Sequence, residues 1–221
     1  MVRQGTTRRR ISPKLRAQAE AVGDRLAHEY PDVRCALEHG NAYELLVATI
    51  LSAQCTDARV NMVTPAVFRR YPSPADLAAA DPDELEDLVR TTGFFRSKAN
   101  NLIRMARDVD ERFGGDVPVS LDDLTSLGGV GRKTANVVRS VAFGEPGLPV
   151  DTHVTRLSKR LGLTRHTDAV KIEFDLMPLF PPEEWGDLSL RLIQHGRKVC
   201  FARKPACGSC SLNDICPSSL A

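Results

Sequence analysis

The sequence predicts an all-α fold of about ten helices. Apolar residues recur at intervals of three and four along most of the chain, and β-branched residues follow the same helical spacing. Serine, threonine, aspartate and proline stand where these patterns begin, whereas glycine or proline stands where they end. No segment alternates as a half-buried strand would, and no internal repeat is visible.

The strongest single element is segment 43–54, YELLVATILSAQ, which is apolar nearly all round and therefore predicts a buried central helix. Ser97 is expected to cap the helix that ends at Gly114-Gly115, and Asp151 is expected to cap the helix that ends before Gly162. The expected helices span about 13–30, 43–54, 57–68, two short segments after 73 and 81, 98–113, 121–127, 133–143, 152–161, 167–179 and 183–198.

The 221 residues can bury a core as one domain or as two small ones. No apolar run approaches the roughly 20 residues that span a bilayer, and no secretory segment follows Met1, so a cytoplasmic protein without a membrane partner is expected. Residues 1–16 carry six basic side chains and no acid. Residues 1–12 are therefore expected to form a basic flexible tail, with a nucleic-acid-binding arm or an organellar presequence as alternatives.

The net charge of +2 gives no sign of a nucleic-acid partner, but the distribution of the charges does. Residues 76–87 hold six acids and no base, whereas residues 191–204 hold five bases and no acid. Residues 132–160 hold six bases against two acids. A protein that is acidic on one side and basic on the other can grip a polyanion, although ordinary solvated helix faces explain the same charges.

Residues 127–133, LGGVGRK, place three glycines before a helix that opens with Lys133. Amide groups in such a turn and at the start of a helix can face an anion. The turn has neither the GxGxxG spacing of a dinucleotide site nor the gap of a P-loop, and a plain helix connection is an alternative. Taken alone, Lys133 would contact a phosphate and Asp151 would cap a helix.

Four of the six cysteines lie within 17 residues, in the pattern C-x6-C-x2-C-x5-C. Four thiolates suit either a zinc ion or a [4Fe–4S] cluster, and their spacing does not choose between the two. Disulfides are the poorer interpretation for a chain without a secretory signal. Cys35 and Cys55 are expected to be buried as small hydrophobic residues. The clustered residues are Cys200, Cys207, Cys210 and Cys216.

Four motifs stand in order along the chain: LLVATILSAQCTD at 45–57, LGGVGRKTA at 127–135, VDTH at 150–153, and the four-cysteine pattern after an HGR-containing helix. Together these motifs resemble the endonuclease III family of helix–hairpin–helix DNA glycosylases, over about residues 14–217. The resemblance implies a DNA glycosylase and AP lyase of base excision repair that removes oxidised pyrimidines. It also implies a monomer that binds damaged double-stranded DNA and holds a [4Fe–4S] cluster with the four cysteines.

The implied architecture has two helical lobes that flank a DNA-binding cleft. A six-helix barrel with the helix–hairpin–helix motif would span 35–145, and a discontinuous iron–sulfur lobe would combine 13–34 with 146–221. Lys133 and Asp151 would then face one mouth between the lobes.

By the same resemblance, Lys133 is the catalytic nucleophile: its amine attacks C1′, forms a Schiff base, and leads to β-elimination that cuts the strand 3′ to the lesion. The helix start, Arg132 and partial desolvation are expected to favour the reactive neutral amine. Asp151 is the second catalytic residue, because a carboxylate held at a helix N-terminus can stabilise positive charge on the sugar or relay protons.

The other implied residues contact DNA. Gln54 would fill the gap left by a flipped nucleotide, and Phe94 would enter the stack as a wedge, where relatives often have leucine. Gly128 stands where many relatives have proline, which is expected to loosen the hairpin before folding. The remaining implied contacts are the amides of Gly129, Val130 and Gly131, the pocket residue His153, and the cysteine-loop residues Arg203 and Lys204.

Two other interpretations are open. One is an adenine-excising relative with the same fold and cluster, against which Lys133 and the LSAQCTD segment argue. The other is a non-catalytic DNA-binding or redox module, against which the presence of both Lys133 and Asp151 argues.

Overall fold

The computed structural model describes residues 11–221, so the basic tail expected over 1–12 lies outside the described residues except for its last two. Residues 11–221 form helices and loops without a strand, which confirms the all-α prediction. The α-helices are α1 (Pro13–Glu29), α2 (Ala42–Leu51), α3 (Asp57–Arg70), α4 (Pro74–Ala78), α5 (Pro82–Val89), α6 (Phe95–Phe113), α7 (Leu121–Ser126), α8 (Arg132–Ala142), α9 (Thr152–Arg160), α10 (Ala169–Leu176) and α11 (Trp185–Lys198). Short 3-10 turns are η1 (Arg90–Thr92), η2 (Met177–Leu179), η3 (Pro182–Glu184) and η4 (Cys207–Ser209).

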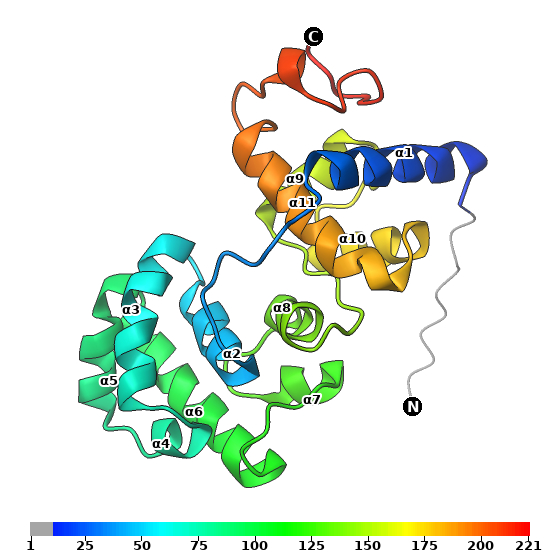
Figure 1. Ribbon diagram of the computed structural model, residues 1–221. Helices are drawn as coiled ribbons and strands as arrows, with labels where there is room; N and C mark the ends of the chain where they lie inside the picture. Colours follow the sequence, from blue (N-terminus) through cyan, green and yellow to red (C-terminus); the bar gives the residue numbers. More distant parts are fainter. Residues whose placement is uncertain (1–10) are drawn as a thin grey trace. The chain divides into compact units, whose positions relative to one another are not determined.

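The described chain divides into two compact units (Figure 1). One, called the hairpin unit below, comprises residues 33–149 and 182–190. The other, called the cysteine unit, comprises residues 11–32, 150–181 and 191–221. The division falls inside α11, so its first turns belong to the hairpin unit rather than to the cysteine lobe expected from the sequence.

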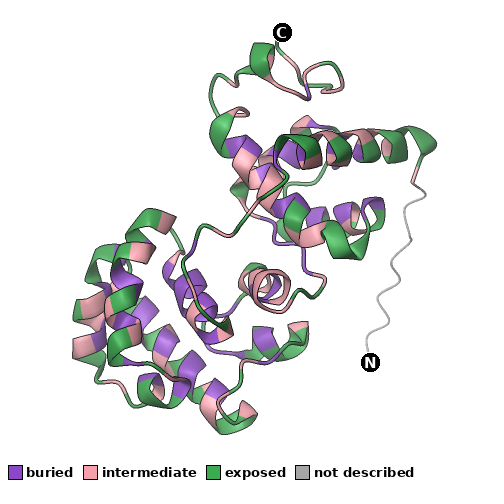
Figure 2. Ribbon diagram, in the orientation of Figure 1, coloured by how far each residue is buried: buried purple, intermediate pink, exposed green. Residues whose placement is uncertain are grey.

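The hairpin unit is built around α2, which contacts α3, α6 and α8 (Figure 1). The Asn41 side chain caps α2 by accepting from the amide of Glu44, and eight of the ten helix residues are buried (Figure 2). The prediction of a buried central helix is therefore confirmed. The core around it joins residues from every helix between α2 and α8, such as Leu46, Leu102 and Val138.

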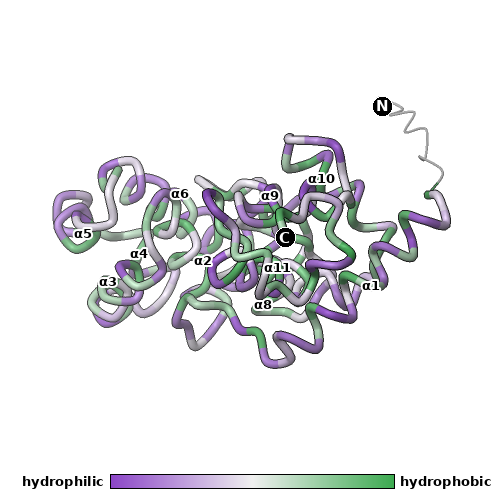
Figure 3. Tube along the Cα trace, turned by 90° about the horizontal axis from the view of Figure 1, so that it is seen from above, coloured by the Kyte–Doolittle hydropathy of each residue, from purple (hydrophilic) through white to green (hydrophobic). Residues whose placement is uncertain are grey.

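The cysteine unit packs around α1, α9, α10 and the end of α11. Ser12 caps α1, and one face of that helix is buried at Ala19, Val22 and Leu26. The alternation of hydrophilic and hydrophobic residues along α1 is visible in Figure 3. The Gln18 side chain of α1 donates to the carbonyl of Leu161 at 3.1 Å, which ties the N-terminal helix to a residue 143 positions away in sequence.

Two predicted helix boundaries are wrong. The helix expected from Lys98 with Ser97 as its cap begins at Phe95, because Gly93 (φ 72°) and Phe94 (φ 49°) turn the chain and the amide of Lys98 donates to the Phe94 carbonyl at 3.0 Å. The helix expected to reach Gln54 ends at Leu51, and Gln54 itself lies in a left-handed turn at φ 53°. Both errors occur where a residue other than glycine adopts a positive φ, which sequence patterns do not signal.

Within residues 11–221, no helix combines the length and the apolar composition needed to cross a bilayer.

Candidate functional site

The glycine turn joins α7 to α8 and packs closely on α6. Gly129 has φ 73°, and a Cβ built on it would lie 2.6 Å from Cβ of Asn101, so only glycine fits there. The amide of Gly128 donates to Oδ2 of Asp108 at 2.8 Å, and the amide of Val130 donates to the carbonyl of Leu127 at 3.2 Å. The turn is therefore fixed by contacts of its own before any ligand binds.

Lys133 is the second residue of α8, so the turn delivers its side chain to the start of a helix. Gly131 is the N-cap residue, and no side chain among residues 11–221 caps α8 by a hydrogen bond. The first-turn amides of α8 lack partners within the helix and can face an anion. The Lys133 side chain is exposed, so the partial desolvation expected from the sequence does not come from the protein itself.

Gln54 and Phe94 lie in the same unit as Lys133, and both side chains are exposed to solvent, Phe94 to 67%. An exposed phenylalanine of this degree has no packing role in the monomer. Among residues 11–221, three residues other than glycine have a positive φ, namely Gln54 (53°), Phe94 (49°) and Lys204 (51°). The family resemblance of the sequence predicts a DNA contact for each of these three residues.

Asp151 lies in the cysteine unit and caps α9, with Oδ1 accepting from the amide of Val154 at 2.8 Å. This bond fixes the orientation of the carboxylate at the start of α9. His153 lies two residues on and contacts Arg156 (Nδ1 to Nη2, 3.1 Å). Burial lowers the pKa of His153, the Asp151 carboxylate opposes this, and the cationic Arg156 and Arg197 lower it further, so the imidazole is held neutral.

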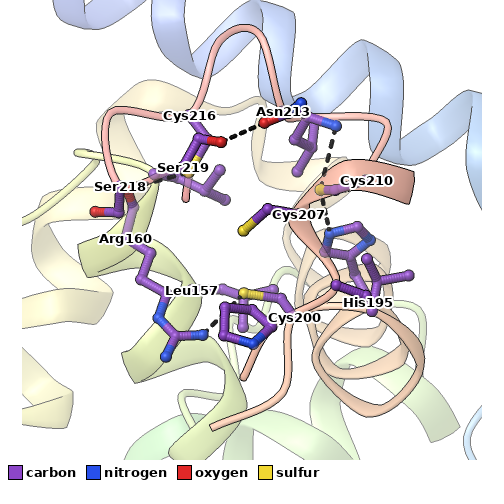
Figure 4. A pocket seen from close by; sticks show the side chains of 15 residues that line it. Leu157, Arg160, His195, Cys200, Cys207, Cys210, Asn213, Cys216, Ser218 and Ser219 are labelled. Carbon is purple, nitrogen blue, oxygen red and sulfur yellow. Dashed lines mark hydrogen bonds between the residues drawn. The ribbon is translucent and has the colours of Figure 1, made fainter. Parts of the chain in front are cut away.

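The four clustered cysteines line one cavity (Figure 4). Burial raises the pKa of the Cys210 and Cys216 thiols, and the charges of the neighbouring cysteines raise it further. Four thiolates held this close need a positively charged group between them, which iron or zinc ions supply.

The chemistry of the four thiols fits an iron–sulfur cluster. Among residues 11–221, no three histidine, cysteine, aspartate or glutamate side chains are arranged to hold one metal ion. All four sulfur donors belong to residues that line one cavity, as the ligands of one [4Fe–4S] group would.

Other groups donate hydrogen bonds to the sulfur atoms, as is common around metal ligands. Arg160 of α9 donates to Sγ of Cys200 at 3.2 Å, and the amide of Leu212 donates to Sγ of Cys210 at 3.4 Å (Figure 4). The buried His195 lies between Sγ of Cys210 (3.3 Å) and the hydroxyl of Tyr30 (3.1 Å). The sequence identifies His195 only as part of the HGR motif and does not predict these contacts.

The loop that carries the cysteines is tied to the rest of its unit. Arg25 of α1 donates to the carbonyl of Ser211 at 2.9 Å and forms a two-bond ion pair with Asp214. The guanidinium of Arg25 lowers the pKa of Asp214. Gln18 donates to the carbonyl of Ile215 at 2.9 Å. The N-terminal helix therefore holds the far end of the chain in place.

The remaining two cysteines differ from the expectation. Cys35 and Cys55 are half-buried rather than fully buried, and they pack at the edge of the hydrophobic core. Cys35 lies in the loop between α1 and α2, and Cys55 lies in the turn between α2 and α3.

Family models and solved structures identify what this fold and these sites resemble. Residues 47–182, more than half of the chain, match the HhH-GPD superfamily of base excision DNA repair proteins. Residues 200–216 match the iron–sulfur binding domain of endonuclease III. The chain thus has the helix–hairpin–helix fold of a DNA repair protein, followed by a cluster-binding segment.

Comparison with individual proteins narrows the class of DNA repair protein further. Endonuclease III of Synechocystis is 54% identical over 193 residues, which is 87% of this chain and 88% of that protein. Endonuclease III of Bacillus subtilis is 46% identical over 200 residues, covering 90% and 91%. The structure of a non-covalent endonuclease III–DNA complex aligns with a TM-score of 0.87 at 45% identity, over 92% of this chain and 95% of that one.

A trapped covalent intermediate of endonuclease III with DNA aligns with a TM-score of 0.88 at 46% identity, over 92% of this chain and 96% of that one. This chain belongs to the endonuclease III family. It is a base excision repair DNA glycosylase with AP lyase activity, and it carries a [4Fe–4S] cluster.

Proposed function

We propose that Lys133 is the residue through which this chain excises oxidised pyrimidines from duplex DNA and then cuts the strand. The observation that carries the proposal is the position of Lys133: an exposed amine at the start of α8, directly after a glycine turn packed on α6. An amine held beside the first-turn amides lies next to the place where a DNA phosphate binds, and hence close to a sugar carbon.

The chemistry proceeds in two stages. The neutral amine of Lys133 attacks C1′, the bond between C1′ and the base breaks, and the base leaves with the bonding electrons and takes up a proton. The sugar ring opens to a Schiff base on Lys133. Loss of the 2′ proton then shifts electrons to expel the 3′ phosphate, which cuts the strand. Because the protein leaves Lys133 exposed, closure of DNA over the site would exclude water from the amine.

Asp151 would stabilise the positive charge that develops on the sugar and accept protons during these steps. Its Oδ1 is occupied by the amide of Val154, so the carboxylate is held in one orientation. His153, kept neutral by burial, would line the same pocket. Asp151 belongs to the cysteine unit and Lys133 to the hairpin unit.

DNA contacts would come from both units. Because the amide of Val130 already donates within the turn, Gly129 and Gly131 are the better phosphate anchors. Gln54 and Phe94 would enter the stack, and Arg203 with Lys204 would touch the phosphate backbone from the cysteine loop. Support comes from backbone strain, which concentrates at functional sites: Gln54, Phe94 and Lys204 all adopt the left-handed conformation.

The [4Fe–4S] cluster, when bound by Cys200, Cys207, Cys210 and Cys216, supplies a covalent tie for the loop that carries Arg203 and Lys204. Its contribution to the proposed function is therefore to hold cations against DNA. Damaged double-stranded DNA is the partner, bound by a monomer. We also propose that the protein acts in the cytoplasm, since the relatives quoted above are bacterial enzymes.

Borohydride trapping tests the proposal directly. On duplex DNA with one abasic site, the wild-type protein is expected to form a covalent adduct after reduction, and Lys133→Ala is expected to form none. Arg132→Ala is the matched control, because it changes the neighbouring cation and leaves the amine in place. An adduct formed by Lys133→Ala, or none formed by the wild type, would contradict the assignment. A set of duplexes that each hold one damaged base then identifies the preferred lesion, and excision of undamaged adenine would favour the adenine-excising alternative.

A further inference from the structure

Lys98 is a buried cation that the reaction described above does not use. Only 4% of its surface is exposed, and its ammonium group donates to two backbone carbonyls, those of Leu51 at 2.8 Å and Thr92 at 2.7 Å. Burial lowers the pKa of Lys98, whereas the nearby Cys55 opposes this. Burying an ammonium group costs free energy unless its donors are satisfied, so the two carbonyls are needed to hold Lys98 in this position.

Both carbonyls terminate helical segments. Leu51 is the last residue of α2, and Thr92 is the last residue of η1. Carbonyls at the C-terminal end of a helix lack partners within the helix and carry partial negative charge, which a cation can satisfy. One side chain on α6 therefore joins the ends of two elements that are about forty residues apart in sequence.

The residues just beyond these two helix ends are the two that would enter DNA. Gln54 lies three residues after Leu51, and Phe94 lies two residues after Thr92. Both hold a left-handed backbone conformation, at φ 53° and 49°. Such a conformation costs about 1 kcal/mol in a residue other than glycine, so neighbouring contacts have to maintain it. Phe94 is the N-cap residue of α6, and its carbonyl accepts the first bond of that helix from the amide of Lys98 at 3.0 Å.

We propose that Lys98 is a positioning residue that holds the Gln54 and Phe94 segments together in the geometry that enters the base stack. The proposal rests on the DNA repair function proposed above. Two side chains that enter one gap in a duplex need a fixed separation, and a shared cation sets that separation through both backbones. A leucine or methionine at position 98 could fill the space but would leave both carbonyls without a donor.

The test compares two substrates. Lys98→Met is expected to slow single-turnover excision of an oxidised pyrimidine from duplex DNA about tenfold, equivalent to about 1.4 kcal/mol. Borohydride trapping on a single-stranded abasic site, which offers no stack to enter, is expected to stay within about twofold of the wild type. Lys98→Arg, which keeps the charge and the donors, is expected to recover part of the duplex rate.

Tyr43→Phe is the matched control. The Tyr43 hydroxyl is also a buried donor to a backbone carbonyl in the hairpin unit, that of Tyr71 at 2.9 Å, but it lies away from the Gln54 and Phe94 segments. Loss of this hydroxyl is expected to lower the stability of the protein but to change the reactions on the duplex and single-stranded substrates to the same extent. Equal loss on both substrates in Lys98→Met, or the same separation in Tyr43→Phe, would show a merely structural role and overturn the proposal.

A combined substitution tests the route of action. If Lys98 acts through Gln54 and Phe94, then Lys98→Met in a background that carries both Gln54→Ala and Phe94→Ala is expected to slow duplex excision no further. Independent, additive losses would contradict the proposal.

Hydrogen exchange separates this inference from the proposed function. Lys98→Met is expected to speed amide exchange at 52–56 and 92–95 while leaving the rest of the hairpin unit unchanged. Unchanged exchange in these segments would overturn the positioning role, whatever the enzyme does. If the wild-type protein forms no adduct, the proposed function is refuted instead. The exchange rates then still decide whether Lys98 positions the two segments.

Discussion

Replacing Gly128 with proline is expected to destabilise this chain. Proline has no amide hydrogen, so the bond from the Gly128 amide to Oδ2 of Asp108 (2.8 Å) would be lost. A Cβ at position 128 would also lie 2.6 Å from Cβ of Arg104 and 3.0 Å from the backbone nitrogen of Met105. The turn packed on α6 has to move to make room.

The size of the effect follows from three contributions. A hydrogen bond to a charged group contributes about 1.5–3 kcal/mol, and the lower end applies because the Asp108 side chain is 31% exposed. Overpacking against α6 adds about 1–3 kcal/mol. The stiffer unfolded chain offsets about 0.4–1 kcal/mol. The expected net loss is about 2 kcal/mol, which lowers the unfolding midpoint by roughly 4–8 °C for a chain of this size.

Thermal unfolding followed by circular dichroism measures this difference in the wild type, Gly128→Pro, Asp108→Ala and the double variant. If the lost hydrogen bond matters, the penalty of proline is expected to shrink in the Asp108→Ala background. A Gly128→Pro protein with a higher midpoint than the wild type would refute the reasoning, because unfolded-state entropy would then outweigh both contacts.

Two further predictions concern the cysteine unit. Burial lowers the folded-state pKa of His153 below its unfolded value of about 6.5, so its neutral form contributes stability above pH 6.5 that is lost as the pH falls through that value. His153→Asn is therefore expected to reduce the fall of the unfolding midpoint between pH 7.5 and 5.5. An unchanged fall in the variant would contradict the lowered pKa. Arg25→Met removes the bonds to Ser211 and Asp214, so it is expected to speed the loss of the cluster's visible absorbance in the presence of a chelator. Arg16→Met, which changes an exposed residue on the same helix, is expected to have no effect on this rate. Equal rates in both variants would show that α1 does not hold the loop.

Local signals predicted much of this molecule. The uninterrupted apolar run of α2 requires burial on all sides, and the structure buries it. An aspartate before a helical pattern satisfies a first-turn amide, and Asp151 does so. The four cysteines meet around one cavity, although they lie on a loop without regular pattern, because their spacing in sequence is short.

The features that sequence reasoning missed depend on contacts between distant segments. Lys98 appeared only as the start of a helix, because nothing in its neighbourhood indicates the carbonyl of Leu51, 47 positions away. The contact between His195 and Tyr30 joins residues 165 positions apart. The left-handed backbone at Phe94 is imposed by surrounding structure, since intrinsic preference disfavours it in phenylalanine.

Peptide mapping of the borohydride-reduced adduct tests the central claim most directly. After trapping on an abasic duplex and digestion of protein and DNA, mass spectrometry is expected to locate the sugar remnant on Lys133 alone. A remnant on another amine, such as Lys98, Lys159 or the N-terminus, would contradict the assignment of the nucleophile to the start of α8.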